Sequence, residues 1–134
     1  MDFAHYDAAV KAAAARFEQG DHAGAAEAFI AIVESDISDL DKAMMSLNVA
    51  VAMDKMGRAD EALSWFDVAI GYEQPYCRVN AVERKAAYLH TSGNNADSLA
   101  LYEWLADQPY ALEHEKERFR YNVSALRGLM AGAR

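Results

Sequence analysis

Three segments of the chain share one pattern, in which a glycine and a polar residue are followed by a small residue and then an aromatic residue. The small and aromatic residues are four positions apart in each copy, and the copies are Gly20, Asp21, Ala25, Phe29, then Gly57, Arg58, Ala62, Phe66, then Gly93, Asn94, Ser98, Tyr102. The glycines lie 37 and 36 residues apart. A period in this range, with two helices per period, is typical of a helical repeat array. The pattern therefore predicts an all-α chain built from antiparallel helix pairs.

Helix start and stop signals predict seven helices and no strand. We expect them over residues 2–19, 21–34, 40–56, 59–71, 75–91, 95–106 and 109–130. Gly20 suits a left-handed cap at the end of the first helix. Pro75 and Pro109 are expected to open the fifth and seventh helices, because a proline in the first turn loses no hydrogen bond. Asn95 is the predicted cap of the sixth helix, and Cys77 is expected as a small apolar residue at the start of the fifth.

A second set of small residues strengthens the pattern. Ala13, Ala50 and Ala86 each stand twelve residues before the small residue of the next helix. With the glycine and the aromatic residue, this arrangement resembles the tetratricopeptide repeat family, in which the small residues lie where two helices of a hairpin cross. The resemblance implies a right-handed superhelical array of three repeats, at about residues 5–38, 42–74 and 78–109, in a single domain that covers residues 1–134.

The seventh helix repeats part of the third. Leu47, Asn48, Val49 and Ala50 recur 74 residues later as Tyr121, Asn122, Val123 and Ser124. Residues 110–131 are therefore expected to be a capping helix, which an array needs at its end and which must have a polar outer face. The polar face would consist of Glu113, Glu115, Lys116, Glu117, Arg120 and Arg127. The alternative is an unrelated terminal helix with a chance match.

In the family that the chain resembles, the first helices of successive repeats line a concave groove. The residue two positions before the small crossing residue points into that groove, which assigns Lys11, Asn48, Arg84 and Asn122 as a ladder of binding residues. Asn can donate to and accept from a peptide group, and Arg can hold a carboxylate through two parallel hydrogen bonds. The alternative is that all four are solvated polar residues on an open face.

Helical spacing of three and four adds further groove candidates. They are Phe17, Met44, Leu47, Val51, Lys55, Asn80, Ala87 and His90, with Asp7, Val10, Ala14, Asp54, Glu83, Tyr121 and Ala125 as further members. Several of the apolar members could equally belong to the core.

The function implied by the resemblance is that of a protein-interaction adaptor, or a small chaperone-like module, that binds a peptide segment in the groove. The alternative is a structural component that self-assembles through the array ends or the convex face. The apolar residues Leu99, Leu101, Trp104 and Leu105 make the sixth helix apolar around much of its girth. We expect them to be buried against the seventh helix, and an exposed patch for self-association is the competing interpretation.

Composition narrows the possible partners and locations. The formal net charge is −8, which argues against nucleic acid, because nucleic-acid binding needs a basic stripe that displaces counterions. No run of about 18 apolar residues predicts a membrane span. Cys77 is the single cysteine, so no internal disulfide can form, and no secretory signal begins the sequence. A reducing cytoplasm is the expected location.

No pattern in the sequence indicates catalysis. The four histidines, His5, His22, His90 and His114, have no paired ligand spacing. No phosphate-cradling glycine loop and no nucleophile motif occurs. We therefore expect neither an enzyme nor a cofactor or metal site.

Overall fold

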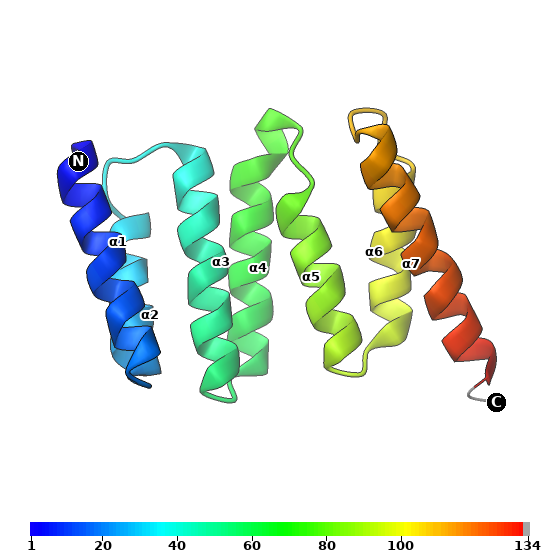
Figure 1. Ribbon diagram of the computed structural model, residues 1–134, viewed down its shortest axis with the longest axis horizontal. Helices are drawn as coiled ribbons and strands as arrows, with labels where there is room; N and C mark the ends of the chain where they lie inside the picture. Colours follow the sequence, from blue (N-terminus) through cyan, green and yellow to red (C-terminus); the bar gives the residue numbers. More distant parts are fainter. Residues whose placement is uncertain (133–134) are drawn as a thin grey trace. The chain divides into compact units, whose positions relative to one another are not determined.

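The computed structural model describes residues 1–132, which form seven α-helices and no strand (Figure 1). The helices are α1 (Phe3–Glu18), α2 (His22–Val33), α3 (Asp39–Lys55), α4 (Ala59–Glu73), α5 (Asn80–Thr91), α6 (Asn95–Ala106) and α7 (Glu113–Gly132), with a short 3-10 helix at Gln74–Tyr76 between α4 and α5. The predicted all-α class is confirmed. Within the described range, no helix combines the length and the apolar character that crossing a membrane requires.

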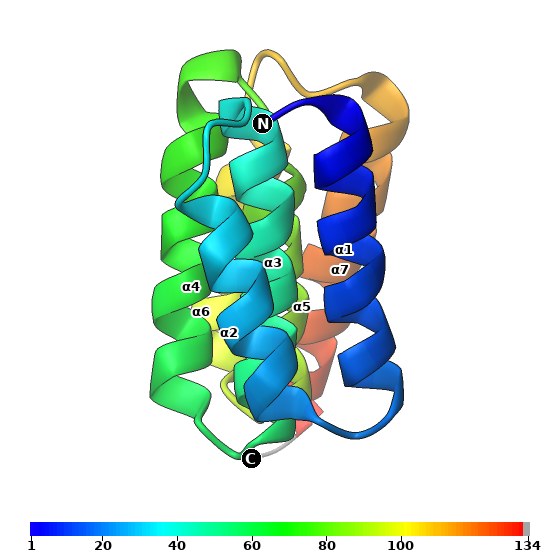
Figure 2. The same cartoon turned by 90° about the vertical axis from the view of Figure 1, so that its left-hand side faces the viewer.

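Contacts between helices divide the chain into two compact units. The first unit, Met1–Pro75, contains α1 to α4, and the second unit begins at Tyr76 and contains α5 to α7. Within the first unit α1 packs on α2, α2 on α3, and α3 on α4, while in the second α5 packs on α6 and α6 on α7. Figure 2 shows the first helix of each hairpin in the first unit, α1 and α3, on the same side of its partner, α2 or α4. The superhelical order of the whole array stays a prediction.

The three hairpins close in the same way, as the glycine pattern predicts. Each of the three repeated glycines has a left-handed backbone, with φ of 83°, 74° and 87° at Gly20, Gly57 and Gly93. The residue after each glycine donates its N–H to the carbonyl five positions back, which pairs Asp21 with Arg16, Arg58 with Met53 and Asn94 with Leu89 at 2.9, 2.9 and 2.8 Å. These bonds satisfy carbonyls that the end of a helix leaves free. The repeated sequence pattern therefore produces a repeated turn.

The predicted crossing points of the hairpins are fully buried. All six small residues, Ala13 with Ala25, Ala50 with Ala62 and Ala86 with Ser98, have no exposed surface. In the third hairpin the contact is explicit, because the Ser98 hydroxyl donates a 2.7 Å hydrogen bond to the carbonyl of Ala86. Small side chains at these points let two backbones approach closely. The aromatic residues that follow, Phe29, Phe66 and Tyr102, are buried as well.

Helix α3 buries two faces, whereas α7 buries one. The residues of α3 at 45, 49 and 52 correspond to Phe119, Val123 and Leu126 of α7, and all six are buried. Ala50 of α3 belongs to a second buried stripe, which comprises Ala43, Ser46, Leu47, Ala50 and Met53. The corresponding residues of α7 are Glu117, Arg120, Tyr121, Ser124 and Arg127, and all of them are exposed. An exposed second face is what the last helix of an array would present, and the capping role of α7 stays a prediction.

Two helix starts predicted from proline are wrong. Pro75 lies in the short 3-10 helix and α5 begins five residues later, at Asn80. Between them Cys77 is exposed and has a left-handed backbone, with φ of 55°, so the chain cannot run helically through it. The expected place of Cys77 in the first turn of a helix is therefore also wrong.

The start of α7 and the cap of α6 are corrected in a similar way. Helix α7 begins at Glu113 and not near Pro109, because the Glu115 carboxylate accepts the N–H of Leu112 at 2.8 Å and so closes the first turn there. The cap of α6 is Asn94 and not Asn95, since the Asn94 side-chain oxygen accepts the N–H of Asp97. The cap of α3 is Ser38, which lies in the connection between α2 and α3.

The expected burial of α6 against α7 holds for one of its large apolar residues and fails for another. Leu105 is fully buried, while Leu99 and Leu101 are half-buried. Trp104 is 40 % exposed, because it lies one position before Leu105 and so faces a different side of the helix. The Trp104 side chain is thus part of the surface of the second unit.

Candidate functional site

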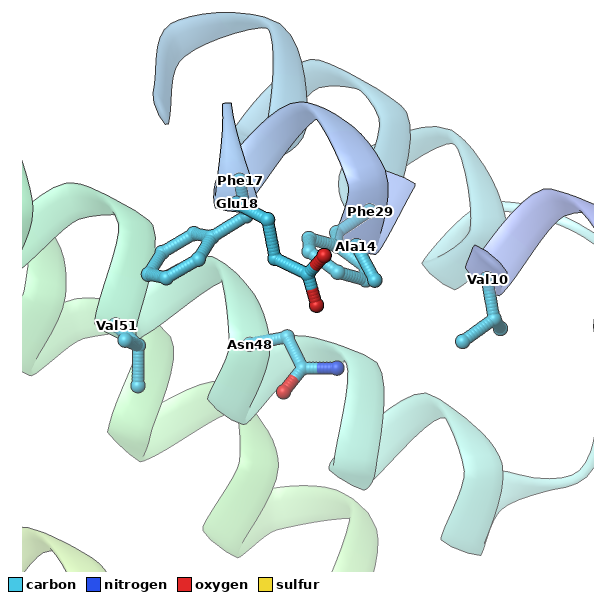
Figure 3. Close-up of a pocket in the computed structure, with 7 residues that line it drawn as sticks. All are labelled: Val10, Ala14, Phe17, Glu18, Phe29, Asn48 and Val51. Atoms are coloured by element: carbon cyan, nitrogen blue, oxygen red, sulfur yellow. The ribbon is translucent and has the colours of Figure 1, made fainter. Parts of the chain in front are cut away.

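An open pocket in the first unit brings together residues from three helices (Figure 3). Its volume is about 220 Å³, and it is lined by Val10, Ala14, Phe17, Glu18, Phe29, Asn48 and Val51. We call it the α1–α3 pocket, because six of these residues belong to α1 and α3. Five of the seven lining side chains are apolar, so the pocket can hold an apolar group of a ligand.

Helical spacing explains how α1 and α3 form the walls. Val10, Ala14, Phe17 and Glu18 are separated by four, three and one positions, which places them on one face of α1. Phe29 of α2 is buried and contributes to the lining from below the surface. The Phe17 ring also contacts His22 of α2, edge to face, with ring centroids 4.8 Å apart.

Asn48 supplies the one amide of the lining. Its side chain is half-buried, and its only hydrogen-bond contact within the described residues is a weak one, from Nδ2 to the Met45 sulfur at 4.0 Å. An amide can donate two hydrogen bonds and accept two, so most of its capacity is free. Figure 3 shows that the Asn48 side chain reaches toward the centre of the lining.

Other predicted site residues extend the pocket along α3. Met44, Asn48, Val51 and Lys55 are spaced by four, three and four, so they form one stripe of the helix. Met44 is 57 % exposed and Lys55 is exposed. The stripe therefore continues from the pocket in both directions with accessible side chains.

Lys11 and Leu47, like Met44 and Lys55, are predicted residues of the first unit that lie outside the pocket lining. Lys11 is exposed and forms an ion pair with Asp7 one turn earlier, at 2.8 Å. The hydrogen bond that Lys11 donates to Asp7 raises the pKa of Lys11, and the Asp7 charge adds to the rise. Leu47 is buried, which favours the core over the groove for this residue.

The remaining predicted residues belong to the second unit. Asn80, Arg84 and Ala87 are spaced by four and three on one exposed face of α5. His90 is exposed near the end of α5, with its Nδ1 2.8 Å from the side-chain oxygen of Asn95. Asn122 is half-buried on α7. The ladder of four donors takes two residues from each unit, so its continuity stays a prediction.

A charged cluster joins α5 and α7 next to these residues. Arg118 of α7 donates two hydrogen bonds to the Glu83 carboxylate of α5, at 2.7 and 2.8 Å. Burial raises the pKa of the nearby Tyr102 phenol, the Glu83 charge raises it further, and the Arg118 charge opposes the rise. Helical spacing marked Glu83 as a groove candidate, but sequence reasoning did not find its partner Arg118.

Two residues of the α1–α3 pocket were not expected there. Phe29 was assigned to packing by the repeat pattern, and it does pack, but one edge also lines the pocket. Glu18 lies four residues after Ala14, and the same spacing had already identified Val10, Ala14 and Phe17. The signal for Glu18 was therefore present in the sequence, and its charge made it look like an ordinary surface residue.

No family model matches the chain, and neither does any curated protein. Within residues 1–132, no cluster of three or more His, Cys, Asp or Glu side chains forms a group that could hold a metal ion. The chemistry of the α1–α3 pocket is therefore the strongest available guide to function.

Proposed function

We propose that the chain is a protein-interaction module, an adaptor or a small chaperone-like protein, that binds an extended peptide segment of a partner along α1 and α3. One observation carries the proposal: a mostly apolar, open pocket contains an amide, that of Asn48, with nearly all of its hydrogen-bonding capacity free. Apolar walls with a few placed polar groups are the usual composition of a binding site.

The size of the pocket favours a peptide side chain over a free small molecule. Small-molecule sites usually measure about 300–1,000 Å³, and this pocket has about 220 Å³. One aliphatic side chain of a partner fits such a space. The Asn48 amide would then pair with the adjoining peptide group, since it matches both its donor and its acceptor.

The binding surface extends beyond the pocket in this proposal. Met44 and Lys55 continue the α3 stripe, and the flexible thioether of Met44 adapts to differently shaped partners. Arg84 and Asn122 of the second unit would contact a further part of a long segment. The mechanism is recognition without turnover, and we propose neither a cofactor nor a nucleic-acid partner. A reducing location such as the cytoplasm suits a chain whose single cysteine is an exposed free thiol.

The direct test is a selection from a peptide display library with no charge or sequence bias. Asn48→Ala should weaken the selected peptides about tenfold or more, because the partner's peptide group loses its hydrogen bonds in a desolvated site. Ser64→Ala is a matched control, since it removes a polar side chain from an exposed position of α4 and should leave affinity unchanged.

Variants that include Arg84 or Asn122 of the second unit test the ladder of donors. The double variant Asn48→Ala with Arg84→Ala should abolish capture, with helicity and melting temperature unchanged. Asn122→Ala should weaken only peptides long enough to contact both units. Full retention of binding by the double variant would rule out the ladder as the site.

A second candidate function is self-assembly, and exposed apolar residues on the second unit favour it. Tyr121 and Leu129 are 74 % and 54 % exposed, lie two turns apart on one stripe of α7, and enclose the exposed Ala125. Light scattering tests this candidate with Trp104→Asp and with Tyr121→Ser combined with Leu129→Ser. A concentration-dependent oligomer that these variants dissociate supports self-assembly, whereas a monomer at every concentration contradicts it.

A further inference from the structure

The acidic character of the chain is confined to its first unit. Residues 1–75 contain fourteen Asp and Glu side chains against five Lys and Arg, whereas residues 76–134 contain seven against eight. The negative field of the protein therefore originates around the unit that contains the α1–α3 pocket. Such a field attracts cationic partners and accelerates their association at low salt.

One acidic residue carries this charge into the pocket. Glu18 is the only charged residue in the lining, and Figure 3 shows that its carboxylate extends over the pocket toward the side of Asn48. Within the described residues Glu18 forms no ion pair or hydrogen bond through its side chain. The exposed Glu18 carboxylate thus lies beside apolar walls with no cation among residues 1–132 paired to it.

The position of Glu18 in its helix makes its unpaired negative charge still less favourable. Glu18 is the last residue of α1, where the helix dipole is negative and disfavours another negative charge. A cation placed there would interact favourably with both the carboxylate and the helix end. Arg16 is the basic residue of that last turn, but it lines a different surface groove, with Ala28 and Ala31 of α2.

The other nearby cations do not neutralise the pocket. Lys11 is already paired with Asp7. Lys55 lies one turn beyond Val51 on α3, with Asp54 next to it in the chain, and it makes no ion pair with Glu18. The charge within the lining is therefore negative, and a complementary ligand must be positive at this point.

We propose that the partner segment is basic: an aliphatic side chain enters the α1–α3 pocket, and an adjacent Arg or Lys of the same segment pairs with Glu18. This inference rests on the proposed function and specifies the chemistry of the partner. Phe17 and Val51 contact the aliphatic anchor, Asn48 binds the peptide group beside it, and Glu18 receives the cation. An arginine would suit best, because its guanidinium can pair with both carboxylate oxygens.

The test uses three labelled peptides that differ only beside the anchor. Each carries one central leucine, flanked on both sides by arginine, by serine or by glutamate. NMR titration of the full chain follows the Asn48 side-chain amide and the Val51 methyl groups, which report on the pocket itself. The arginine peptide should bind roughly fivefold more tightly than the serine peptide, and the glutamate peptide most weakly. The preference should shrink at about 0.5 M salt.

Two variants separate a local contact from the general field. Glu18→Gln should remove most of the preference for arginine over serine, measured as the ratio of the two dissociation constants within that variant. Glu27→Gln removes the same charge from an exposed position of α2 outside the pocket and should retain the preference. Equal losses in the two variants would overturn the assignment of Glu18, because only net charge would then matter.

Three other outcomes also decide the matter. Equal binding of the arginine and serine peptides at the pocket overturns the basic partner and leaves the proposed peptide-binding function standing. If none of the three peptides shifts the NMR signals of the pocket, the inference is overturned. The unbiased library selection then decides separately whether the proposed function holds. Shifts at Asn48 that depend on protein concentration alone would mean that a second copy occupies the pocket, which also overturns the inference.

Discussion

Arg118 of α7 holds Glu83 of α5 through two parallel hydrogen bonds, at 2.7 and 2.8 Å, although α6 separates the two helices in the chain. The main packing partner of α7 is α6, so this ion pair adds a polar contact with a second helix, α5. The guanidinium also lies over the Phe119 ring, with 5.3 Å from its carbon to the ring centroid. Arg118 thus connects α7 to α5 in addition to the packing of α7 on α6.

Breaking this pair should destabilise the protein modestly. Both side chains are partly solvated, with 45 % of Arg118 and 23 % of Glu83 exposed, so we expect a loss of about 0.5–1 kcal/mol for Arg118→Met. A double-mutant cycle with Glu83→Gln, followed by thermal and chemical unfolding, measures the coupling. Additive effects of the two substitutions would show that the pair contributes nothing beyond its separate parts.

Stability should fall at alkaline pH because of Tyr102. Burial raises the pKa of Tyr102 above its usual value of 10.0, so folding favours the neutral phenol. This contribution is complete below about pH 10 and is lost as the pH rises through the pKa in the folded state. Tyr102→Phe should reduce the alkaline loss of stability, while Tyr121→Phe, at an exposed position, should not change it.

The same phenol reports on Arg118. Because the Arg118 charge lowers the pKa of Tyr102, Arg118→Met should raise it further. Ultraviolet titration of tyrosinate, with the Tyr102→Phe variant as the reference for the other tyrosines, measures this shift. A lowered pKa in Arg118→Met would contradict the proximity of the two groups.

Two glycine-to-alanine substitutions should have opposite signs. Gly57 ends α3 with φ of 74°, so alanine there should cost about 1 kcal/mol through backbone strain. Gly71 lies inside α4 with an ordinary helical backbone, and the space that an alanine methyl group would occupy is open. Gly71→Ala should stabilise by about 0.4–1 kcal/mol, because the unfolded chain loses freedom. Melting temperatures of the two variants should move in opposite directions.

A larger side chain at a helix crossing should be poorly tolerated. Ala62 is fully buried where α4 meets α3, and Ala62→Leu should destabilise by about 1–3 kcal/mol or more through overpacking. Ala59→Leu makes the same change at an exposed position of the same helix and should be nearly neutral. Equal stability of the two variants would mean that the backbones do not approach closely at residue 62.

The sequence predicts the hairpins well because backbone geometry constrains them directly. A glycine is needed for a left-handed turn, and only a small residue fits where two helices cross. Both residue types therefore recur at fixed spacing in the sequence. Gly20 has the predicted left-handed conformation, which Gly57 and Gly93 share, and Ala13 and Ala25 are buried where the helices cross.

Helix starts are harder to predict, because several residues can cap a helix. Pro75 and Pro109 are both compatible with a first turn, but local hydrogen bonds decide the outcome. The Glu115 carboxylate accepts the N–H of Leu112 and so sets the first turn of α7. The left-handed backbone of Cys77 prevents a continuous helix before α5. Neither event has a strong sequence signal.

The pocket was predicted in part. Helical spacing identified Val10, Ala14, Phe17 and Val51 as groove candidates, and the family resemblance identified Asn48; all five line the pocket. Glu18 has the right helical spacing, but its charge is typical of an ordinary surface residue. That no cation of the described residues pairs with it is visible only in the three-dimensional structure. Phe29 was missed as a lining residue because the repeat pattern assigned it wholly to packing.

The exposed polar stripe of α7 determines whether a further hairpin can grow onto this end of the second unit. A helix added there in the manner of α4 on α3 would have to strip water from Glu117, Arg120 and Arg127. It would also bury the ion pairs that Arg120 forms with Glu113 and Arg127 with Glu103, which is unfavourable. Exchanging Glu117, Arg120, Arg127 and Ser124 for their α3 counterparts, Ala43, Ser46, Met53 and Ala50, would remove that barrier. The altered α7 would then present a second face like that of α3, so these four side chains oppose the addition of another helix to α7.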